Sequence, residues 1–164
     1  MPKIIKDRVI ADDGFSPVIR DGALPPEGPV LVGLSFWREH REQLLARGGL
    51  IGVQLEPADD ALSLSEDIAR LALVAIHFPA FADGRGYSHA WLLRNRLGYR
   101  GELRAVGDVF KDNLYYLSRC GFNSFAIRAD KDIGIALRGL DDFSEGYLGT
   151  TTTPAPLFRR RLTI

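Results

Sequence analysis

Five short apolar runs alternate with segments of helical character along most of this chain. The runs have the length of strands and cover residues 30–36, 50–56, 73–78, 102–107 and 123–128. Helical segments follow them at residues 37–47, 63–71, 88–97, 109–120 and 130–140, and Ser63 to Glu66 resembles a capping box. Because strands and helices alternate in this way, the pattern predicts parallel βα units with right-handed crossovers.

The two faces of the predicted strands differ in polarity. One face carries Ile51, Val53 and Leu55 and similar apolar residues in the later strands, whereas the other carries polar residues such as Glu56 and Arg104. A doubly wound sheet would be apolar on both faces of its central strands. The pattern therefore predicts an α/β fold of about five parallel strands, a partial TIM-barrel-like sheet with helices on the apolar face. A flavodoxin-like open sheet is the alternative.

The chain is too short for a complete barrel and is expected to form a single domain. It has 164 residues, whereas eight βα units typically need about 250. We expect an N-terminal arm over residues 1–29, an α/β core over 30–143 and a C-terminal tail over 144–164. Five units would leave sheet edges open, and the tail contains Leu157 and Phe158, so we expect a homodimer.

The charge balance and the single cysteine exclude several classes of protein. Lys and Arg together number 21, as do Asp and Glu, so no overall charge attracts nucleic acid or an anionic membrane. Cys120 alone can form neither an intramolecular disulfide nor an iron–sulfur cluster. No NAD, flavin or haem motif is visible, and no apolar run is long enough to span a membrane. We expect a cytoplasmic protein whose cofactors, if any, remain unknown.

Polar residues gather where the predicted strands end, which is where parallel α/β folds place their sites. The candidate catalytic residues are Glu56, His77, Asp83 and Asp108, and Arg104 and Arg128 are candidate ligand-binding residues. Asp83, Asp108 and Asp130 follow three successive strands, so their carboxylates are candidate ligands of Mg²⁺. The alternative is that each aspartate caps a helix.

The segment Asp83–Ser88 is the candidate binding loop. The sequence consists of Asp83, Gly84, Arg85, Gly86, Tyr87 and Ser88. Its glycines permit close backbone approach, the following helix offers free N–H groups, and Arg85 is suited to a carboxylate, phosphate or sulfur oxyanion. The structural alternative is a tight turn in which Ser88 caps the helix and Arg85 pairs with Asp83.

Several stretches together resemble a known bacterial family. They are Phe78-Pro79, residues 83–88, residues 92–109 and residues 112–122. They resemble a family of unknown function that is described as an oxidoreductase of sulfite reduction and whose genes accompany those of assimilatory sulfite reductase. The resemblance runs from about residue 28 to residue 143. It implies a role in sulfur assimilation, with sulfite reductase components as partners.

Two hypotheses of function follow from these patterns. In the first, the chain is a non-catalytic accessory protein of assimilatory sulfite reduction that binds an oxyanion at the carboxyl ends of its strands. In the second, it is a small enzyme, either an oxidoreductase or a Mg²⁺-dependent TIM-like enzyme, that acts on a sulfur oxyanion or a phosphorylated metabolite.

Overall fold

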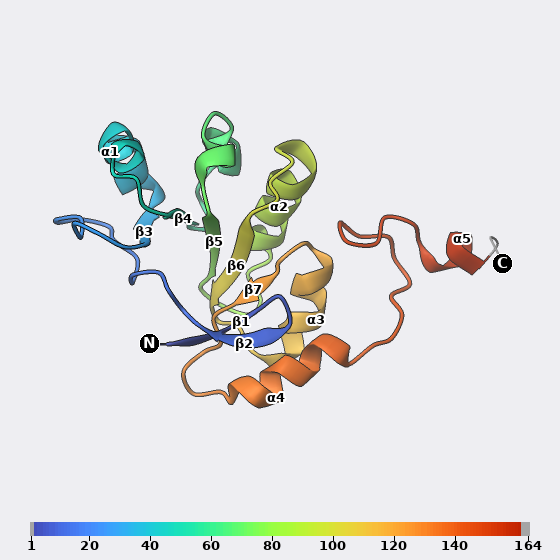
Figure 1. Ribbon diagram of the computed structural model, residues 1–164. Coiled ribbons are helices and arrows are strands. Elements are labelled where there is room, and N and C mark those ends of the chain that lie inside the picture. The colour runs from blue at the N-terminus through green and yellow to red at the C-terminus, as the bar shows by residue number, and fades with distance from the viewer. Residues whose placement is uncertain (1, 162–164) are drawn as a thin grey trace.

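One open, mostly parallel sheet organises the computed structural model, which describes residues 2–161 (Figure 1). Its strand order is β2-β1-β7-β6-β5-β4-β3. The strands are β1 (Lys3–Lys6), β2 (Val9–Asp12), β3 (Val30–Gly33), β4 (Ile51–Leu55), β5 (Leu73–Phe78), β6 (Glu102–Gly107) and β7 (Ser124–Phe125). Strands β3 to β7 are parallel to one another, and β1 is antiparallel to both β2 and β7.

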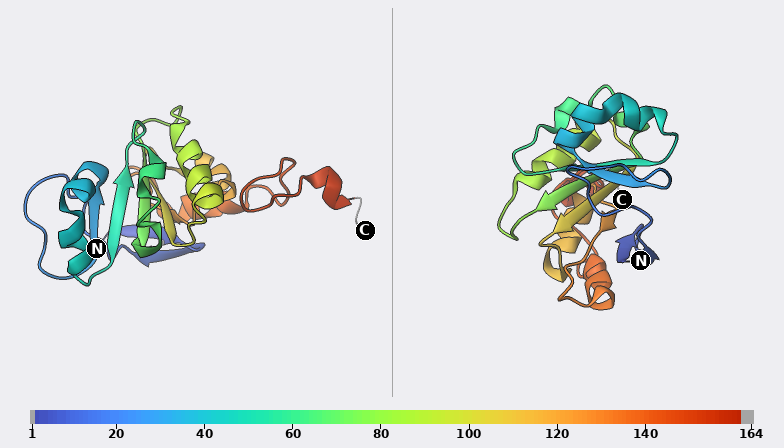
Figure 2. Two further views of the ribbon diagram at one scale, coloured as in Figure 1. Left: turned by 90° about the horizontal axis from the view of Figure 1, so that it is seen from above. Right: turned by 90° about the vertical axis from the view of Figure 1, so that its left-hand side faces the viewer.

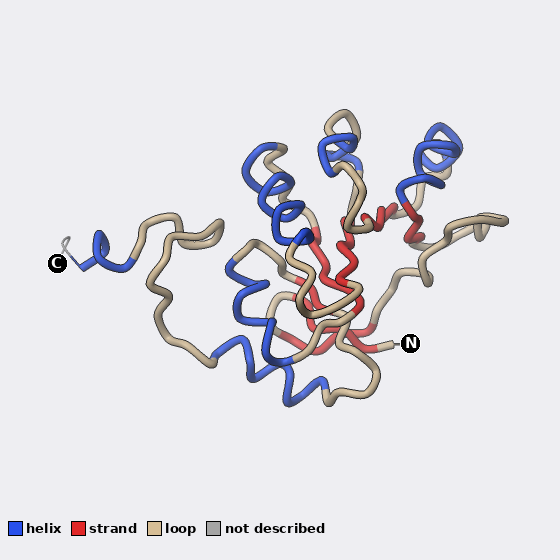
Figure 3. Tube along the Cα trace, turned by 180° about the vertical axis from the view of Figure 1, so that it is seen from behind, coloured by secondary structure: helices blue, strands red, loops and turns tan. Residues whose placement is uncertain are grey.

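The sheet does not close, so the expected partial TIM-barrel character is not confirmed and the open-sheet alternative fits. From β3 to β7 the strands lie side by side in the order of the sequence, unlike the order 2-1-3-4-5 of flavodoxin. When each right-handed crossover moves one position in the same direction, all the connecting helices lie on one face. Figures 1 and 3 show α1 (Leu34–Ala46), α2 (Arg85–Trp91) and α3 (Lys111–Arg119) gathered on one side.

The helices cover the face predicted for them. Val53 and Ile76 of the sheet belong to the main core cluster. The same cluster contains Leu44 of α1, Leu93 just after the end of α2, and Leu114 of α3. On the opposite face the apolar cluster is small, with Leu31, Leu73 and Ala75 covered in part by Phe15 and Val18 of the N-terminal segment. Polar side chains occupy much of the remaining open face, as described below.

Several predicted helices have other bounds or types in the structure. The segment 63–71 is two 3-10 helices, η1 (Ala61–Leu64) and η2 (Ile68–Arg70), and Asp60 rather than Ser63 caps the first through the N–H of Leu62. Helix α2 begins before Ser88 and continues as a π-helical turn, η3 (Leu92–Arg96). The last helical segment is α4 (Ile133–Arg138) followed by η4 (Gly139–Asp141). Local hydrogen bonds such as the Asp60 cap therefore set boundaries that periodicity alone misplaced.

The N-terminal segment pairs with both edge strands of the parallel part of the sheet. Residues 3–12 form a hairpin whose two turn residues, Asp7 and Arg8, have φ of 48° and 68°, the geometry of a tight two-residue turn. Ile5 of this hairpin pairs with Phe125 of β7. At the other end, the backbone N–H of Ile19 donates to Leu31 O at 2.8 Å, so the segment also lines β3.

The C-terminal segment that follows η4, residues 142–161, runs away from the sheet and includes α5 (Leu157–Arg161), as Figure 2 shows. Four large apolar side chains of this segment, Phe143, Tyr147, Leu148 and Phe158, are more than half exposed. Expectations for residues 162–164 lie outside the described residues. In the part of the chain from residue 2 to 161, no helix is long and apolar enough to cross a membrane.

Candidate functional site

Glu56 and His77 meet on the open face of the sheet, where β4 and β5 end. Glu56 follows β4 directly, and His77 is the penultimate residue of the adjacent β5. His77 Nδ1 lies 2.6 Å from Glu56 Oε2, while Arg20 Nη2 and Gln54 Nε2 lie 2.6 and 3.0 Å from Glu56 Oε1. We call this pair the Glu56–His77 dyad. Two of the predicted catalytic residues are thus in direct contact.

The dyad leaves one nitrogen of the imidazole available. With Nδ1 donating to Glu56, the neutral His77 ring carries a lone pair on Nε2. None of the hydrogen bonds formed within residues 2–161 uses Nε2, and the His77 side chain as a whole is 31% exposed, so solvent reaches part of the ring. The ring packs over the backbone of Gly107, where a Cβ would lie 2.7 Å from His77 Cδ2. A carboxylate that orients an imidazole in this way suits proton transfer or ligand binding.

The charge of Glu56 is stabilised by its neighbours. Its partial burial would raise the pKa of the carboxyl group, but hydrogen bonds from Arg20, His77 and Gln54 outweigh burial and lower the pKa to about 2. At neutral pH the carboxylate is therefore ionised and holds the imidazole through Nδ1.

The lowered pKa of Glu56 predicts a pH-dependent contribution to stability. A carboxyl group whose pKa falls on folding stabilises the protein above its ordinary pKa of 4.5, and this stabilisation is lost as the pH falls toward 2. Glu56→Gln should therefore unfold more easily than the wild type at pH 7, by at most about 1 kcal/mol because the pair is partly solvated. The difference, measured by urea unfolding, should disappear between pH 4.5 and 2. A difference that stays constant down to pH 2 would contradict this assignment.

Arg104 lies on the same face but is buried in a second polar cluster. Its side chain is 2% exposed, and its Nη2 and Nη1 lie 2.7 and 2.9 Å from Glu102 Oε1 and Asp13 Oδ2. Lys6 Nζ also lies 2.7 Å from Glu102 Oε2. Burial opposes ionisation of Glu102, but Lys6 and Arg104 lower its pKa overall. In this arrangement the predicted ligand-binding residue Arg104 joins the N-terminal segment to the sheet and presents no guanidinium surface to solvent.

Asp108 and Arg128 form a third cluster at the ends of β6 and β7. Arg128 forms ion pairs with Asp108 and with Asp130, the latter at 2.6 Å, and Asp108 also accepts the backbone N–H of Phe81 at 2.8 Å. The guanidinium lies 5.3 Å from the ring centroid of Phe110. Asp83 does not join this cluster. Among residues 2–161, no group of three or more acidic, histidine or cysteine side chains is arranged to hold a metal ion.

The predicted binding loop is closed by an internal ion pair. Asp83 accepts hydrogen bonds from Nε and Nη2 of Arg85 at 3.0 and 2.6 Å and from the Arg85 backbone N–H at 3.2 Å. These bonds from Arg85 lower the pKa of Asp83 to about 2. The Asp83 carboxylate thus occupies the place where an external anion would meet Arg85. Gly84 precedes α2, and Gly86 packs so tightly on Phe78 that a Cβ would lie 2.5 Å from Phe78 Cζ.

The structure distributes the predicted site residues over four separate clusters. No hydrogen bond or ion pair within residues 2–161 joins the Glu56–His77 dyad, the Arg104 cluster, the Arg128 cluster and the Asp83–Arg85 pair. Arg20 and Asp13 are additional members that the sequence did not indicate. Both lie in the irregular N-terminal segment, where no periodicity places a side chain, although the polar face of the strands signalled that partners were needed.

Comparison with known families places this arrangement in context. Residues 52–158 match the family model described as "Bacterial protein of unknown function (DUF934)". The chain belongs to this family. The DUF934 match covers His77 and the Asp83–Arg85 pair, whereas Arg20 and Asp13 lie before it. The matched residues therefore include both members of the dyad. The segment before them supplies Arg20 to the dyad and Asp13 to the Arg104 cluster. No match was found among curated proteins.

Proposed function

We propose that this protein is a cytoplasmic accessory protein of assimilatory sulfite reduction that binds a small oxyanion at the Glu56–His77 dyad. The resemblance to a family whose genes accompany assimilatory sulfite reductase supports the pathway. The accessory role agrees with a sequence that has one cysteine and no dinucleotide, flavin or haem motif. The observation that supports the binding site is that His77 Nε2 has no hydrogen-bond partner within residues 2–161 and lies on a sheet face that none of the described helices covers.

The chemistry of the dyad suits a protonatable oxyanion such as sulfite. A neutral His77 accepts a hydrogen bond at Nε2, and a protonated His77 donates one, so the ring can match either protonation state of the ligand. Arg20 lies beside the same carboxylate, is 53% exposed, and provides a positive charge. An anion that approached Arg20 would compete with the Glu56 carboxylate for the guanidinium group. This competition would favour anions of high charge.

The alternative is a small enzyme in which His77 acts as a general base. This alternative is favoured by the 2.6 Å distance between His77 Nδ1 and Glu56 Oε2, since a carboxylate that orients imidazole is a common arrangement for proton abstraction. The substrate in this case would be a sulfur oxyanion or a phosphorylated metabolite bound at the same open face.

We further propose a homodimer that contacts components of sulfite reductase. The support is the C-terminal segment, which extends from the body and exposes Phe143, Tyr147, Leu148 and Phe158. Apolar side chains that are this exposed on an extended segment are typical of a surface that another chain covers.

A growth experiment tests both the pathway and the site. A strain that lacks the gene is expected to grow on cysteine or sulfide but poorly on sulfate or sulfite as sole sulfur source. The wild-type gene and the Arg85→Ala variant should restore growth, because the Arg85 pair is exposed and separate from the dyad. His77→Ala should not restore it, since the free Nε2 is lost.

Each outcome of this experiment separates one part of the proposal. Undiminished growth of the deletion strain on sulfate and sulfite would contradict the role in sulfite reduction. Full restoration of growth by His77→Ala would show that the dyad is not the functional site. His77→Gln can still hydrogen-bond Glu56 and a ligand, but it cannot accept a proton. Growth restored by His77→Gln would support a binding role for the dyad. Growth that His77→Gln does not restore would support the enzyme alternative. Calorimetry with sulfite and sulfate on purified wild type and His77→Ala measures binding directly.

A further inference from the structure

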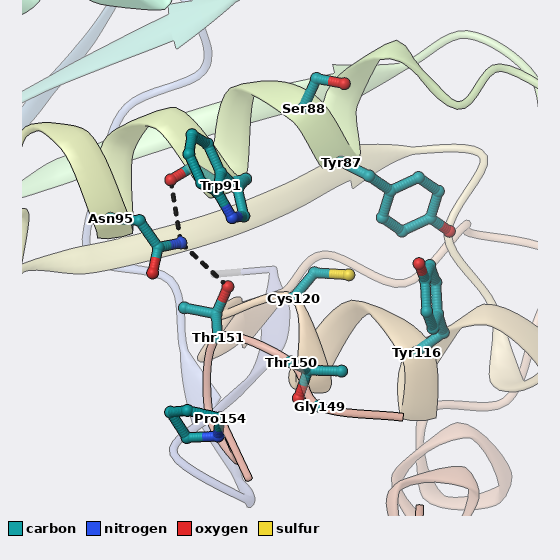
Figure 4. A pocket seen from close by; sticks show the side chains of 10 residues that line it. All are labelled: Tyr87, Ser88, Trp91, Asn95, Tyr116, Cys120, Gly149, Thr150, Thr151 and Pro154. Atoms are coloured by element: carbon teal, nitrogen blue, oxygen red, sulfur yellow. Dashed lines mark hydrogen bonds between the residues drawn. The ribbon is translucent and has the colours of Figure 1, made fainter. Parts of the chain in front are cut away.

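A cavity of about 520 Å³ lies on the helix side of the sheet, between α2, α3 and the C-terminal segment (Figure 4). This volume is within the range of small-molecule sites. Tyr87, Ser88 and Trp91 of α2 form one wall, and Tyr116 of α3 faces them. Tyr87 and Ser88 belong to the predicted binding loop, so the structure directs the second half of that loop into a cavity rather than toward the strand ends.

The walls of this cavity are aromatic and uncharged. Trp91 and Tyr116 are 51% and 53% exposed, which leaves wide ring surfaces open, and the Tyr87 and Tyr116 ring centroids lie 5.0 Å apart. Among the described residues, no Asp, Glu, Lys, Arg or His lines the cavity. Burial raises the pKa of Tyr87 to about 12 and also raises the pKa of Cys120, so both groups stay protonated at neutral pH. A charged ligand would therefore lose its hydration without meeting an opposite charge.

Hydrogen-bonding groups also line the same cavity. Thr150 Oγ1 is buried and has no hydrogen-bond partner within residues 2–161. The segment Gly149–Pro154 passes over the cavity and is held there by Asn95 Nδ2, which lies 3.2 Å from Thr151 Oγ1. Buried hydroxyl groups are nearly always paired, so the unpaired Thr150 hydroxyl points to a polar atom supplied by a ligand.

We propose that this cavity binds an uncharged, planar ring compound with hydrogen-bonding edges, of the nucleobase or nucleoside class. The ring stacks on Trp91 or Tyr116, and its edge reaches the Thr150 hydroxyl. Rings of this kind stack on aromatic side chains irrespective of their substituents, and the absence of charged side chains from the walls selects the neutral form. This site lies apart from the Glu56–His77 dyad and does not depend on it.

Adenosine and AMP are the probes that test this proposal. Trp37 is buried in the core at 2% exposure, so a change in tryptophan emission on adding a ligand reports on the half-exposed Trp91. Adenosine is expected to change the emission, and calorimetry should show that it binds more tightly than AMP, which differs by a charged phosphate. Trp91→Ala should weaken adenosine binding at least about fivefold, the lower end of the range for losing one stacking partner.

Matched variants make the result decisive. Phe81→Ala removes an aromatic side chain of similar exposure, 53%, outside the cavity and should leave adenosine binding unchanged. If circular dichroism shows that Trp91→Ala is misfolded, Asn95→Ala, which removes a lining side chain and its hydrogen bond to Thr151, provides a second test and should also weaken binding. The proposal is overturned if millimolar adenosine gives neither heat nor an emission change, if AMP binds as tightly as adenosine, or if Phe81→Ala weakens binding as much as Trp91→Ala.

Discussion

Replacing Arg104 with Met is expected to lower the free energy of unfolding by about 3–5 kcal/mol, the cost of breaking a buried ion pair from one side. Arg104 is 2% exposed and holds the carboxylates of Glu102 and Asp13, which are 4% and 14% exposed. Met fills a similar volume but leaves these carboxylates without the guanidinium, and Lys6 contacts only Glu102. Urea unfolding at pH 7 followed by circular dichroism measures the effect.

Arg85→Met is the matched control for this prediction. It also removes one arginine that is paired with an aspartate, but the Arg85 side chain is 61% exposed. Exposed ion pairs contribute about 0–1 kcal/mol, so the control should unfold nearly like the wild type. Equal losses in the two variants would show that burial of the Arg104 cluster does not govern its contribution.

Replacing Gly107 with Ala is expected to lower the free energy of unfolding by about 2–4 kcal/mol, since backbone strain and overpacking add at this position. Gly107 has φ +94°, and a Cβ there would lie 2.3 Å from the backbone oxygen of Phe78 and 2.7 Å from His77 Cδ2. The chain must shift to relieve these contacts, and the shift moves the imidazole of the dyad. Thermal and urea unfolding measure the loss of stability.

Gly98→Ala separates backbone strain from crowding. Gly98 also has a positive φ, +64°, but nothing lies within 4 Å of the position of its Cβ. The control should therefore lose only about 1–2 kcal/mol from the left-handed conformation. A loss in Gly107→Ala no larger than this would mean that the contacts with Phe78 and His77 relax without cost.

The sequence predicted the parallel sheet because strands alternate with helices, and it predicted which face the helices cover because strand residues repeat with a period of two. The apolar set with Val53 and Ile76 is the face that the helices cover. The same alternation could not show whether the sheet closes, since closure depends on strand tilt and register rather than on polarity. Nor could it reveal that residues 3–12 join the sheet beside β7, because antiparallel pairing across such a separation leaves no local signal.

The candidate site was predictable only in part, for a related reason. Glu56 and His77 were selected because adjacent parallel strands bring their ends together, and the two residues are in contact. Asp83, by contrast, follows β5 after a loop, and the length of that loop lets it fold back on Arg85 instead of reaching Asp108. The direction of a side chain in a loop depends on its partners, which strand periodicity does not describe.

The pairing of β1 with β7 has a consequence for the order in which the chain can fold during synthesis. Ile5 and Phe125, which lie opposite each other, are 120 residues apart in the sequence (125 − 5). At about 5–20 residues per second, the ribosome needs roughly 6–24 s to make the partner of the first hairpin. During this interval Ile4 and Ile5, which are buried in the finished protein, can pair with β2 but not with β7. The hairpin is therefore made long before β7 and is among the last of these elements to gain all its partners, so we expect a chaperone to bind it in this interval.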